Sequence, residues 1–213
     1  MLEELRYQVW KYNLELPKYG LVKMTSGNIS GRDRATGLVV IKPSGYSYEE
    51  MKPEDMVVVD LEGRMIEGHL QPSVDTETHL YVYAHRPDVW GIGHTHSAYA
   101  TSFAVLGRPI PACMTACAML GGEIPVGGFA AIGGAEIGAE IVRAIGDKRA
   151  VLMQNHGVFT IGDSPRQAAK MAVEVEEIAR TVHLASLLGE PILLTQEQLA
   201  LTGDLYRNIY GQR

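Results

Sequence analysis

The sequence has no uninterrupted apolar run near the roughly 18 residues that a membrane-spanning helix needs. It also contains only two cysteines in 213 residues, Cys113 and Cys117. Two cysteines make no disulfide framework, and their spacing is not that of a CxxC zinc or redox pair. We therefore expect a cytoplasmic protein with no membrane partner, in which both cysteines are small core residues.

An excess of positive charge is also missing. The chain has 19 Lys and Arg against 25 Asp and Glu, a formal net charge of −6. A general nucleic-acid binder needs a basic face, so we expect no nucleic-acid partner, although a small basic pocket stays compatible with this balance. The first residues, MLEELRYQVWKY, mix charges into an apolar pattern, which is not typical of a signal peptide.

The chain also lacks repeats, low-complexity tracts and linkers, so residues 1–213 are expected to form a single α/β domain. No G-x-G-x-x-G follows the first strand, which argues against a dinucleotide-binding fold. Periodicity and capping signals predict helices over 2–16 (ended by Pro17), from a Ser73 cap to about 85, over 134–146, and from a Ser164 cap to Gly189. They also predict a turn between two short extended runs near Ser26-Gly27-Asn28 and a hairpin turning near Glu62-Gly63.

Two histidines stand one residue apart in GIGHTHSAY, where an apolar run finishes. Alternate side chains of a strand share a face, so His94 and His96 point the same way. His156 has a similar setting, because it follows the apolar run 150–153 and precedes a glycine. Three imidazoles at strand ends match catalytic zinc sites, which keep a fourth position open for water or substrate.

The fourth protein ligand is open at this point. Asp75 lies near the start of an expected helix, and His79, four residues later, is a rival on the same helix face. Three other folds with a His-x-His pair do not fit. A cupin needs a glutamate shortly after the pair, a metallo-β-lactamase needs Asp-His where Ser97 and Ala98 stand, and an amidohydrolase barrel needs about 250 residues.

Six motifs in order cover nearly the whole chain: LPKYGLVKMTSGNIS, IKPSG, PSVDTETH, GIGHTHS, QNHGVF and the terminal YGQ. Together they resemble the class II aldolase and L-ribulose-5-phosphate 4-epimerase family, whose fold is also that of the adducin head domain. The resemblance implies a three-layer α/β/α sandwich with a mixed, mostly antiparallel central sheet. It also implies a homotetramer with active sites at the subunit interfaces.

The resemblance further implies roles for individual residues. His94, His96 and His156 correspond to the ligands of Zn²⁺, or of another divalent transition metal in its place, with Asp75 as the family's carboxylate. Lys42 would face the site and offset negative charge on the substrate. Tyr210, in the terminal NIYGQR, corresponds to an acid/base that reaches a neighbouring subunit's site. The phosphate-binding positions would be Gly27, Asn28, Ser44, Gly45, Ser73 and Val74, in turns whose amides and hydroxyls suit phosphate.

The sequence also departs from the family. Epimerases carry an acidic residue near Met119 and aldolases a tyrosine near Thr115, so the second acid/base is unassigned, and Val74 replaces a serine. The resemblance favours metal-dependent retro-aldol chemistry on a phosphorylated ketose, with L-ribulose-5-phosphate 4-epimerase (forming D-xylulose 5-phosphate) first. The alternatives are a class II lyase of the L-fuculose-phosphate aldolase type and a non-catalytic adducin-like interaction module. Such a module is expected to have lost the ligand histidines.

Overall fold

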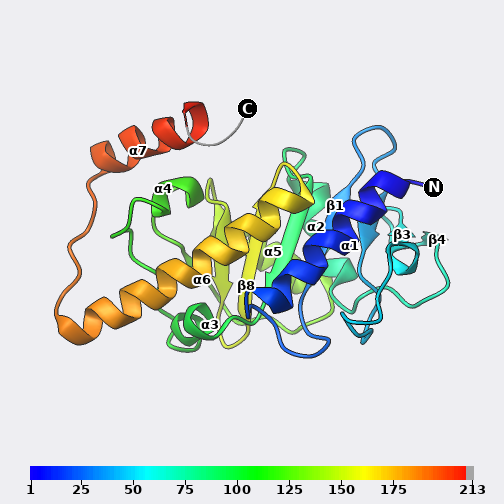
Figure 1. Ribbon diagram of the computed structural model, residues 1–213, viewed down its shortest axis with the longest axis horizontal. Helices are drawn as coiled ribbons and strands as arrows, with labels where there is room; N and C mark the ends of the chain where they lie inside the picture. Colours follow the sequence, from blue (N-terminus) through cyan, green and yellow to red (C-terminus); the bar gives the residue numbers. More distant parts are fainter. Residues whose placement is uncertain (210–213) are drawn as a thin grey trace.

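The computed structural model describes residues 1–209, so Tyr210 lies outside the described residues. Its centre is one eight-stranded sheet in the order β4-β3-β2-β1-β5-β8-β7-β6 (Figure 1). The strands are β1 (Asn28–Arg32), β2 (Val39–Ile41), β3 (Val57–Val59), β4 (Met65–Glu67), β5 (Gly91–Thr95), β6 (Val126–Gly127), β7 (Ala150–Met153) and β8 (Gly157–Gly162). Neighbouring strands pair antiparallel except β6 and β7, which confirms the mixed, mostly antiparallel sheet.

Helices cover both faces of this sheet. One face carries α1 (Glu3–Lys18), α3 (Ala98–Val105) and α6 (Pro165–Leu188), and the other carries α2 (Thr76–His85) and α5 (Ala135–Ile145). The remaining helices are α4 (Cys117–Leu120), α7 (Gln196–Asn208) and the short 3-10 helix η1 (Pro53–Asp55). The expected three-layer α/β/α arrangement is therefore confirmed.

Strand β7 illustrates why the central strands read as continuous apolar runs. Its side chains alternate between the two faces, so Val151 and Met153 pack with α2 and α5 while Ala150 and Leu152 pack with α3 and α6. A strand that is buried on both faces needs apolar residues at every position. Residues 154–156 form the turn that joins β7 to β8.

Several expected boundaries are confirmed. Ser164 caps α6, accepting a hydrogen bond from the Gln167 amide at 3.2 Å, with Pro165 in the first helical position. β3 and β4 form the expected hairpin.

Cys117 is buried and Cys113 half-buried, both as free thiols. No helix in residues 1–209 is long and apolar enough to cross a membrane.

Three local expectations are wrong. Helix α1 continues through Pro17 to Lys18, because a proline in the last turn disturbs little of the hydrogen bonding behind it. Residues 21–27 form turns and bends rather than an extended run, so only β1 follows the predicted turn. Ser73 does not cap α2. The helix begins at Thr76 with Asp75 at its N-cap, and the Ser73 carbonyl oxygen accepts from the Thr76 amide.

Helix α7 was not expected from the sequence. Thr195 and Gln198 form a capping box at its start, which is a readable N-terminal signal. Only Gly203 of this helix is buried, so its apolar residues do not follow a stripe against the core. In Figure 1 the helix lies apart from the sheet, joined to α6 by an extended segment and resting near α4.

Candidate metal centre and active site

The candidate site lies where the central strands β1, β5 and β8 end. The antiparallel register places Asn28 opposite His94 on one side and Phe159 opposite it on the other. His94 is in β5 and His96 is one residue beyond the strand, so both side chains point to the same face. His156, in the turn between β7 and β8, completes the group, and its ring centroid lies 4.8 Å from that of His94.

The three histidines can hold one cation. Their ligand atoms all lie within 4.8 Å of one another, and in residues 1–209 no carboxylate joins this group. The Nε2 atoms of His94 and His96 are 3.0 Å apart. His94 Nδ1 donates to the Val158 carbonyl oxygen at 3.0 Å, which leaves its Nε2 with a free lone pair. His156 Nδ1 is buried without a partner among the described residues. This donor set fits a transition metal.

Burial keeps these imidazoles neutral. It lowers the pKa of His94 to about 3, and it also lowers the pKa values of His96 and His156. A histidine binds a metal only through an unprotonated ring nitrogen. The three side chains are therefore in the protonation state that binding requires at neutral pH.

Asp75 faces the same cavity from the N-cap of α2. Its Oδ2 accepts a hydrogen bond of 2.7 Å from Asn28 Nδ2, and its amide donates to Ser73 Oγ at 3.3 Å. Burial alone raises the pKa of Asp75, but the imidazoles of His94 and His79 and the amide of Asn28 lower it by more, so the net shift is downward. Asp75 is thus an ionised carboxylate beside the three histidines, and not one of their ligand group.

His79 is not a fourth ligand. It is fully buried one helical turn after Asp75, and its Nδ1 lies 2.7 Å from Ser30 Oγ, which in turn lies 2.9 Å from the hydroxyl of Tyr83. Burial lowers the pKa of His79 to about 4. The rival ligand is therefore a neutral packing residue behind the site.

Lys42 follows β2 and is almost fully buried in the cavity wall. Its Nζ donates to the carbonyl oxygens of Thr25 and Pro43, at 3.1 and 3.2 Å, and lies 4.9 Å from the centroid of the Tyr48 ring. Burial lowers the pKa of Lys42 to about 8, partly offset by Asp75. A lysine with this pKa is a mobile proton site near neutral pH, which is typical of functional sites.

Two loops meet at the cavity, and backbone pairing brings them together. The Ser73 amide donates to the Lys42 carbonyl oxygen at 3.0 Å, and the Ser44 amide donates to the Gln71 carbonyl oxygen at 2.9 Å. The hydroxyl of Ser44, not its amide, is consequently the group left for a ligand. Gly45 adopts a φ of +60° with open space around it, as a turn glycine should.

Gly27 is required by its surroundings. Its φ is +73°, and a Cβ there would lie 2.8 Å from the His94 carbonyl oxygen and closer still to Val22. The hydroxyl of Tyr48 donates to this loop, 2.9 Å from the carbonyl oxygens of both Ser26 and Gly27. Sequence reasoning missed Tyr48, because its contact with the loop spans 21 residues and no local pattern marks it.

The cavity itself has a volume of about 250 Å³. The structure places every predicted metal and phosphate position in its lining, together with Asp75 and Lys42. The lining residues are Thr25, Ser26, Gly27, Asn28, Lys42, Pro43, Ser44, Gly45, Ser73, Val74, Asp75, His94, His96, Ile132 and His156. Thr115 and Met119, by contrast, do not line this cavity. Ile132 is an apolar wall residue that no sequence pattern marks.

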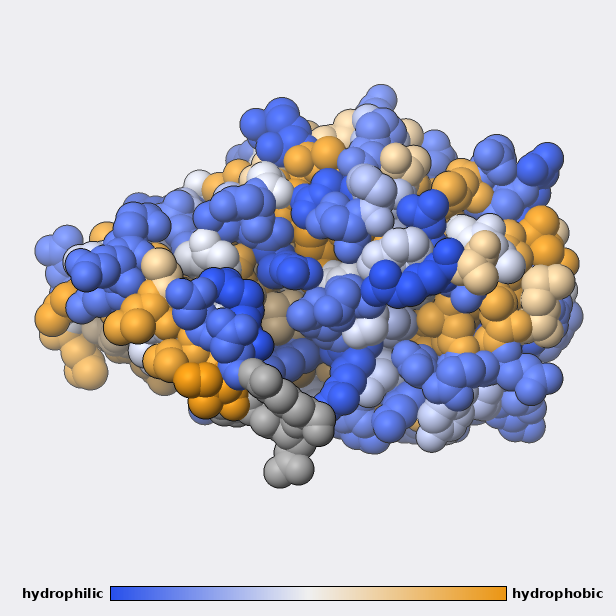
Figure 2. Space-filling view, turned by 90° about the horizontal axis from the view of Figure 1, so that it is seen from above, coloured by the Kyte–Doolittle hydropathy of each residue, from blue (hydrophilic) through white to orange (hydrophobic). Residues whose placement is uncertain are grey.

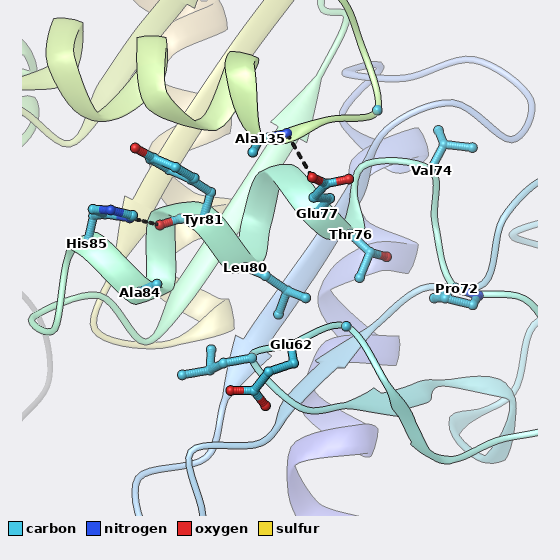
Figure 3. Close-up of a pocket in the computed structure, with 13 residues that line it drawn as sticks. Glu62, Pro72, Val74, Thr76, Glu77, Leu80, Tyr81, Ala84, His85 and Ala135 are labelled. Atoms are coloured by element: carbon cyan, nitrogen blue, oxygen red, sulfur yellow. Dashed lines mark hydrogen bonds between the residues drawn. The ribbon is translucent and has the colours of Figure 1, made fainter.

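A larger hollow of about 620 Å³ lies beside the site and shares Val74 with it (Figure 3). Two of its polar side chains, Glu77 and His85, already have partners. Glu77 accepts from the Ala135 amide at 3.2 Å, and His85 Nδ1 lies 2.8 Å from the Tyr81 carbonyl oxygen. Figure 3 shows Glu77 turned toward Ala135 of α5 and His85 turned toward the backbone of α2, and not toward a common point. The smaller cavity, where imidazoles and a carboxylate converge, is therefore the candidate site.

Comparison with known proteins gives a consistent picture. The family model for the class II aldolase and adducin N-terminal domain matches residues 7–183. The L-ribulose-5-phosphate 4-epimerase UlaF of Salmonella paratyphi B is 41% identical over 198 residues, covering 86% of each chain. A solved L-fuculose 1-phosphate aldolase superposes with a TM-score of 0.91 at 34% identity, covering 96% of each chain. The L-fuculose-1-phosphate aldolase of Thermus thermophilus superposes with a TM-score of 0.76 at 25% identity, covering 89% of this chain and all of that one.

Proposed function

The chain belongs to the class II aldolase and adducin N-terminal domain family, and from this premise we propose that it is an L-ribulose-5-phosphate 4-epimerase forming D-xylulose 5-phosphate. The observation that carries the proposal is the single cavity in which three neutral imidazoles lie beside an ionised Asp75 and two glycine turns. The 41% identity to an epimerase supports the choice of reaction within the family.

His94, His96 and His156 would hold Zn²⁺ or a related divalent transition metal. When bound, the metal supplies Lewis-acid polarisation of the ketose carbonyl. The remaining chemistry falls to the chain's own residues. Asp75, fixed by Asn28, is placed to accept a hydroxyl proton from the substrate and return it, which retro-aldol cleavage and re-addition both require.

Lys42 would act through its charge. Its ammonium lies in the same wall as Asp75 and offsets negative charge that develops on substrate oxygens when the C–C bond breaks. The turns around Gly27-Asn28 and Ser44-Gly45, with Ser73-Val74, would hold the phosphate. Turn amides and hydroxyls suit an anion without a basic surface, which fits the overall charge of −6.

We propose that Tyr210 is an acid/base that acts in the site of a neighbouring subunit of a homotetramer. Tyr210→Phe should then slow turnover without changing metal content, measured by steady-state kinetics and metal analysis. Unchanged turnover would remove Tyr210 from the site.

The two free thiols are consistent with a cytoplasmic enzyme.

A class II aldolase is the second candidate, favoured by the TM-score of 0.91 to the L-fuculose 1-phosphate aldolase. A lyase would release the two fragments that an epimerase must keep and rejoin. The third hypothesis, an adducin-like module without catalysis, is disfavoured because the full set of three histidines lies in one ligand group.

An NMR time course of the zinc-loaded protein with L-ribulose 5-phosphate tests the proposal directly. Accumulation of D-xylulose 5-phosphate is the expected result. Release of glycolaldehyde phosphate would identify a lyase instead. Zinc binding with no change in the sugar would reject this substrate while leaving the metal centre in place, and failure to bind zinc would reject the metal centre itself.

A further inference from the structure

The three histidines are not anchored in the same way. His94 is held by its strand pairing and by its own bond to the Val158 carbonyl oxygen. The ring of His96, by contrast, has a polar contact only with His94 among residues 1–209, and it lies one residue beyond the end of β5. The position of His96 therefore depends on its backbone, and that backbone leads directly into α3.

Helix α3 is linked to the backbone beside both of the less anchored ligands. It starts at Ala98, two residues after His96. Near its other end, the carbonyl oxygen of Ala104 accepts a hydrogen bond of 3.3 Å from the amide of Asn155, the residue before His156. A displacement of α3 would thus move His96 and the turn that carries His156 together.

The N-terminus of α3 lacks a cap of its own. Ser97 occupies the N-cap position, but its hydroxyl makes no capping bond and is buried without a partner among the described residues. The first turn contains no acidic residue. The unsatisfied amides at such a helix start need acceptors, and they carry a partial positive charge.

Glu176 supplies those acceptors from α6. Its Oε1 accepts from the Tyr99 amide at 3.0 Å, and its Oε2 accepts from the Ala100 amide at 2.9 Å. Both carboxylate oxygens are thereby used on two successive amides of one helix start, across 76 to 77 residues of chain. A charged, two-point contact of this kind fixes orientation as well as distance.

We propose that Glu176 is a positioning residue for the metal centre, which clamps the start of α3 to α6 and so sets where His96, and through α3 the His156 turn, can lie. The clamp also places a negative charge at the positive end of a helix beside a cation site, which reduces repulsion of the cation. The consequence for the metal rests on the proposed function, whereas the clamp itself is a property of the metal-free chain.

The test compares Glu176→Gln and Glu176→Ala with Glu177→Gln. Glu177 is the neighbouring residue on α6 and is exposed, so its variant removes the same charge without touching α3. Two readouts are used, both well below the melting temperature. One is amide hydrogen exchange of the metal-free protein over residues 96–105, and the other is the Zn²⁺ dissociation constant from competition with a chromophoric chelator.

We expect faster exchange over 96–105 in both Glu176 variants, and a dissociation constant raised about tenfold in Glu176→Ala, the lower end of the loss seen when outer contacts of metal sites are removed. Gln keeps one acceptor oxygen, so its effect should be smaller, and it provides the test if the alanine variant does not fold. Glu177→Gln should match the wild type in both measurements.

Unchanged exchange in folded Glu176→Gln would overturn the clamp. Faster exchange with wild-type Zn²⁺ affinity in the Glu176 variants would show that Glu176 only stabilises the start of α3, and would overturn its role at the metal centre. An equal loss of Zn²⁺ affinity in Glu177→Gln would overturn that role as well. Wild-type protein that binds no Zn²⁺ would reject the proposed function and this metal role, while the exchange data would still decide whether the clamp exists.

Discussion

Single side chains at this site owe their chemistry to burial. The imidazoles stay neutral because they are buried, whereas the pKa of Asp75 is shifted downward and its carboxylate accepts a hydrogen bond from the Asn28 amide, so it stays ionised. The same cavity wall thus presents electron-pair donors and one proton acceptor at neutral pH. This division of roles predicts that removing Asp75 and removing a histidine have different consequences.

Asp75→Asn should abolish most turnover while the three histidines still bind the metal, since no carboxylate belongs to their ligand group. His94→Asn should lose both metal and turnover while the fold is largely kept. Metal content by mass spectrometry and kcat by a coupled assay check the pair, with circular dichroism as the control for folding. Loss of bound metal in Asp75→Asn would show instead that the carboxylate is a fourth ligand.

The lowered pKa of Lys42 predicts that activity falls at alkaline pH. An amine is cationic below its pKa, and burial lowers that of Lys42 to about 8, so its charge is lost as the pH rises through this value. We expect kcat/KM to fall above about pH 8. In Lys42→Arg this fall in kcat/KM should move to higher pH, because a guanidinium stays protonated. A fall at the same pH in this variant would mean that another titrating group causes it.

At the scale of elements, the turn from β7 into β8 sets how closely His156 approaches the other two histidines. Gly157 follows His156, and a Cβ there would lie 2.5 Å from the Thr95 carbonyl oxygen and 2.7 Å from His96 Cδ2. The backbone of β5 is fixed by pairing on both sides, so the backbone at residue 157 and the His96 ring would both have to move. A glycine is therefore needed for strand packing and for ligand geometry at the same point.

Gly157→Ala should weaken Zn²⁺ binding and destabilise the fold by about 1–3 kcal/mol, the usual cost of forcing an extra methyl group into a packed site. Chelator competition and urea unfolding measure the two effects. Gly189→Ala is the matched control, because nothing lies within 4 Å of a Cβ at that position. Wild-type metal affinity in Gly157→Ala would show that the His96 ring can shift without loss.

The elements also show how much of the structure can be predicted from the sequence alone. A continuous apolar run predicts the strand that carries His94, and a Ser-Pro cap predicts the start of α6, because both signals are local. The start of α2 was misplaced since Ser73 bonds to Asn28 and Asp75 instead of capping the helix. Glu176 escaped notice because its partners lie 76 and 77 residues away. Lys42 was found only through the family resemblance, as burial cannot be read from a local pattern.

At the scale of the whole molecule, the segment from the end of α6 through α7 exposes many apolar side chains despite the net charge of −6. Figure 2 shows hydrophobic side chains among hydrophilic ones at this end of the molecule, and others at the opposite end. Leu188 and Ile192 are 93% and 89% exposed. We call residues 184–209 the C-terminal arm. Its other substantially exposed apolar residues are Leu184, Leu187, Leu193, Leu201, Leu205 and Ile209. Apolar patches of this kind usually mark contacts with another chain.

We expect the C-terminal arm to be covered by further copies of the chain in the proposed homotetramer. Light scattering should give about four times the 23.3 kDa of one chain, as expected for a closed symmetric assembly. Leu188→Glu with Ile192→Glu should lower that mass, because the charges would be buried unpaired. It should also lower turnover if neighbouring subunits complete each site. Met65→Glu, a comparable change on the edge strand β4, is the control and should leave the mass unchanged. A wild-type protein with the mass of one chain would contradict the tetramer and would require Tyr210 to act, if it acts, within its own subunit.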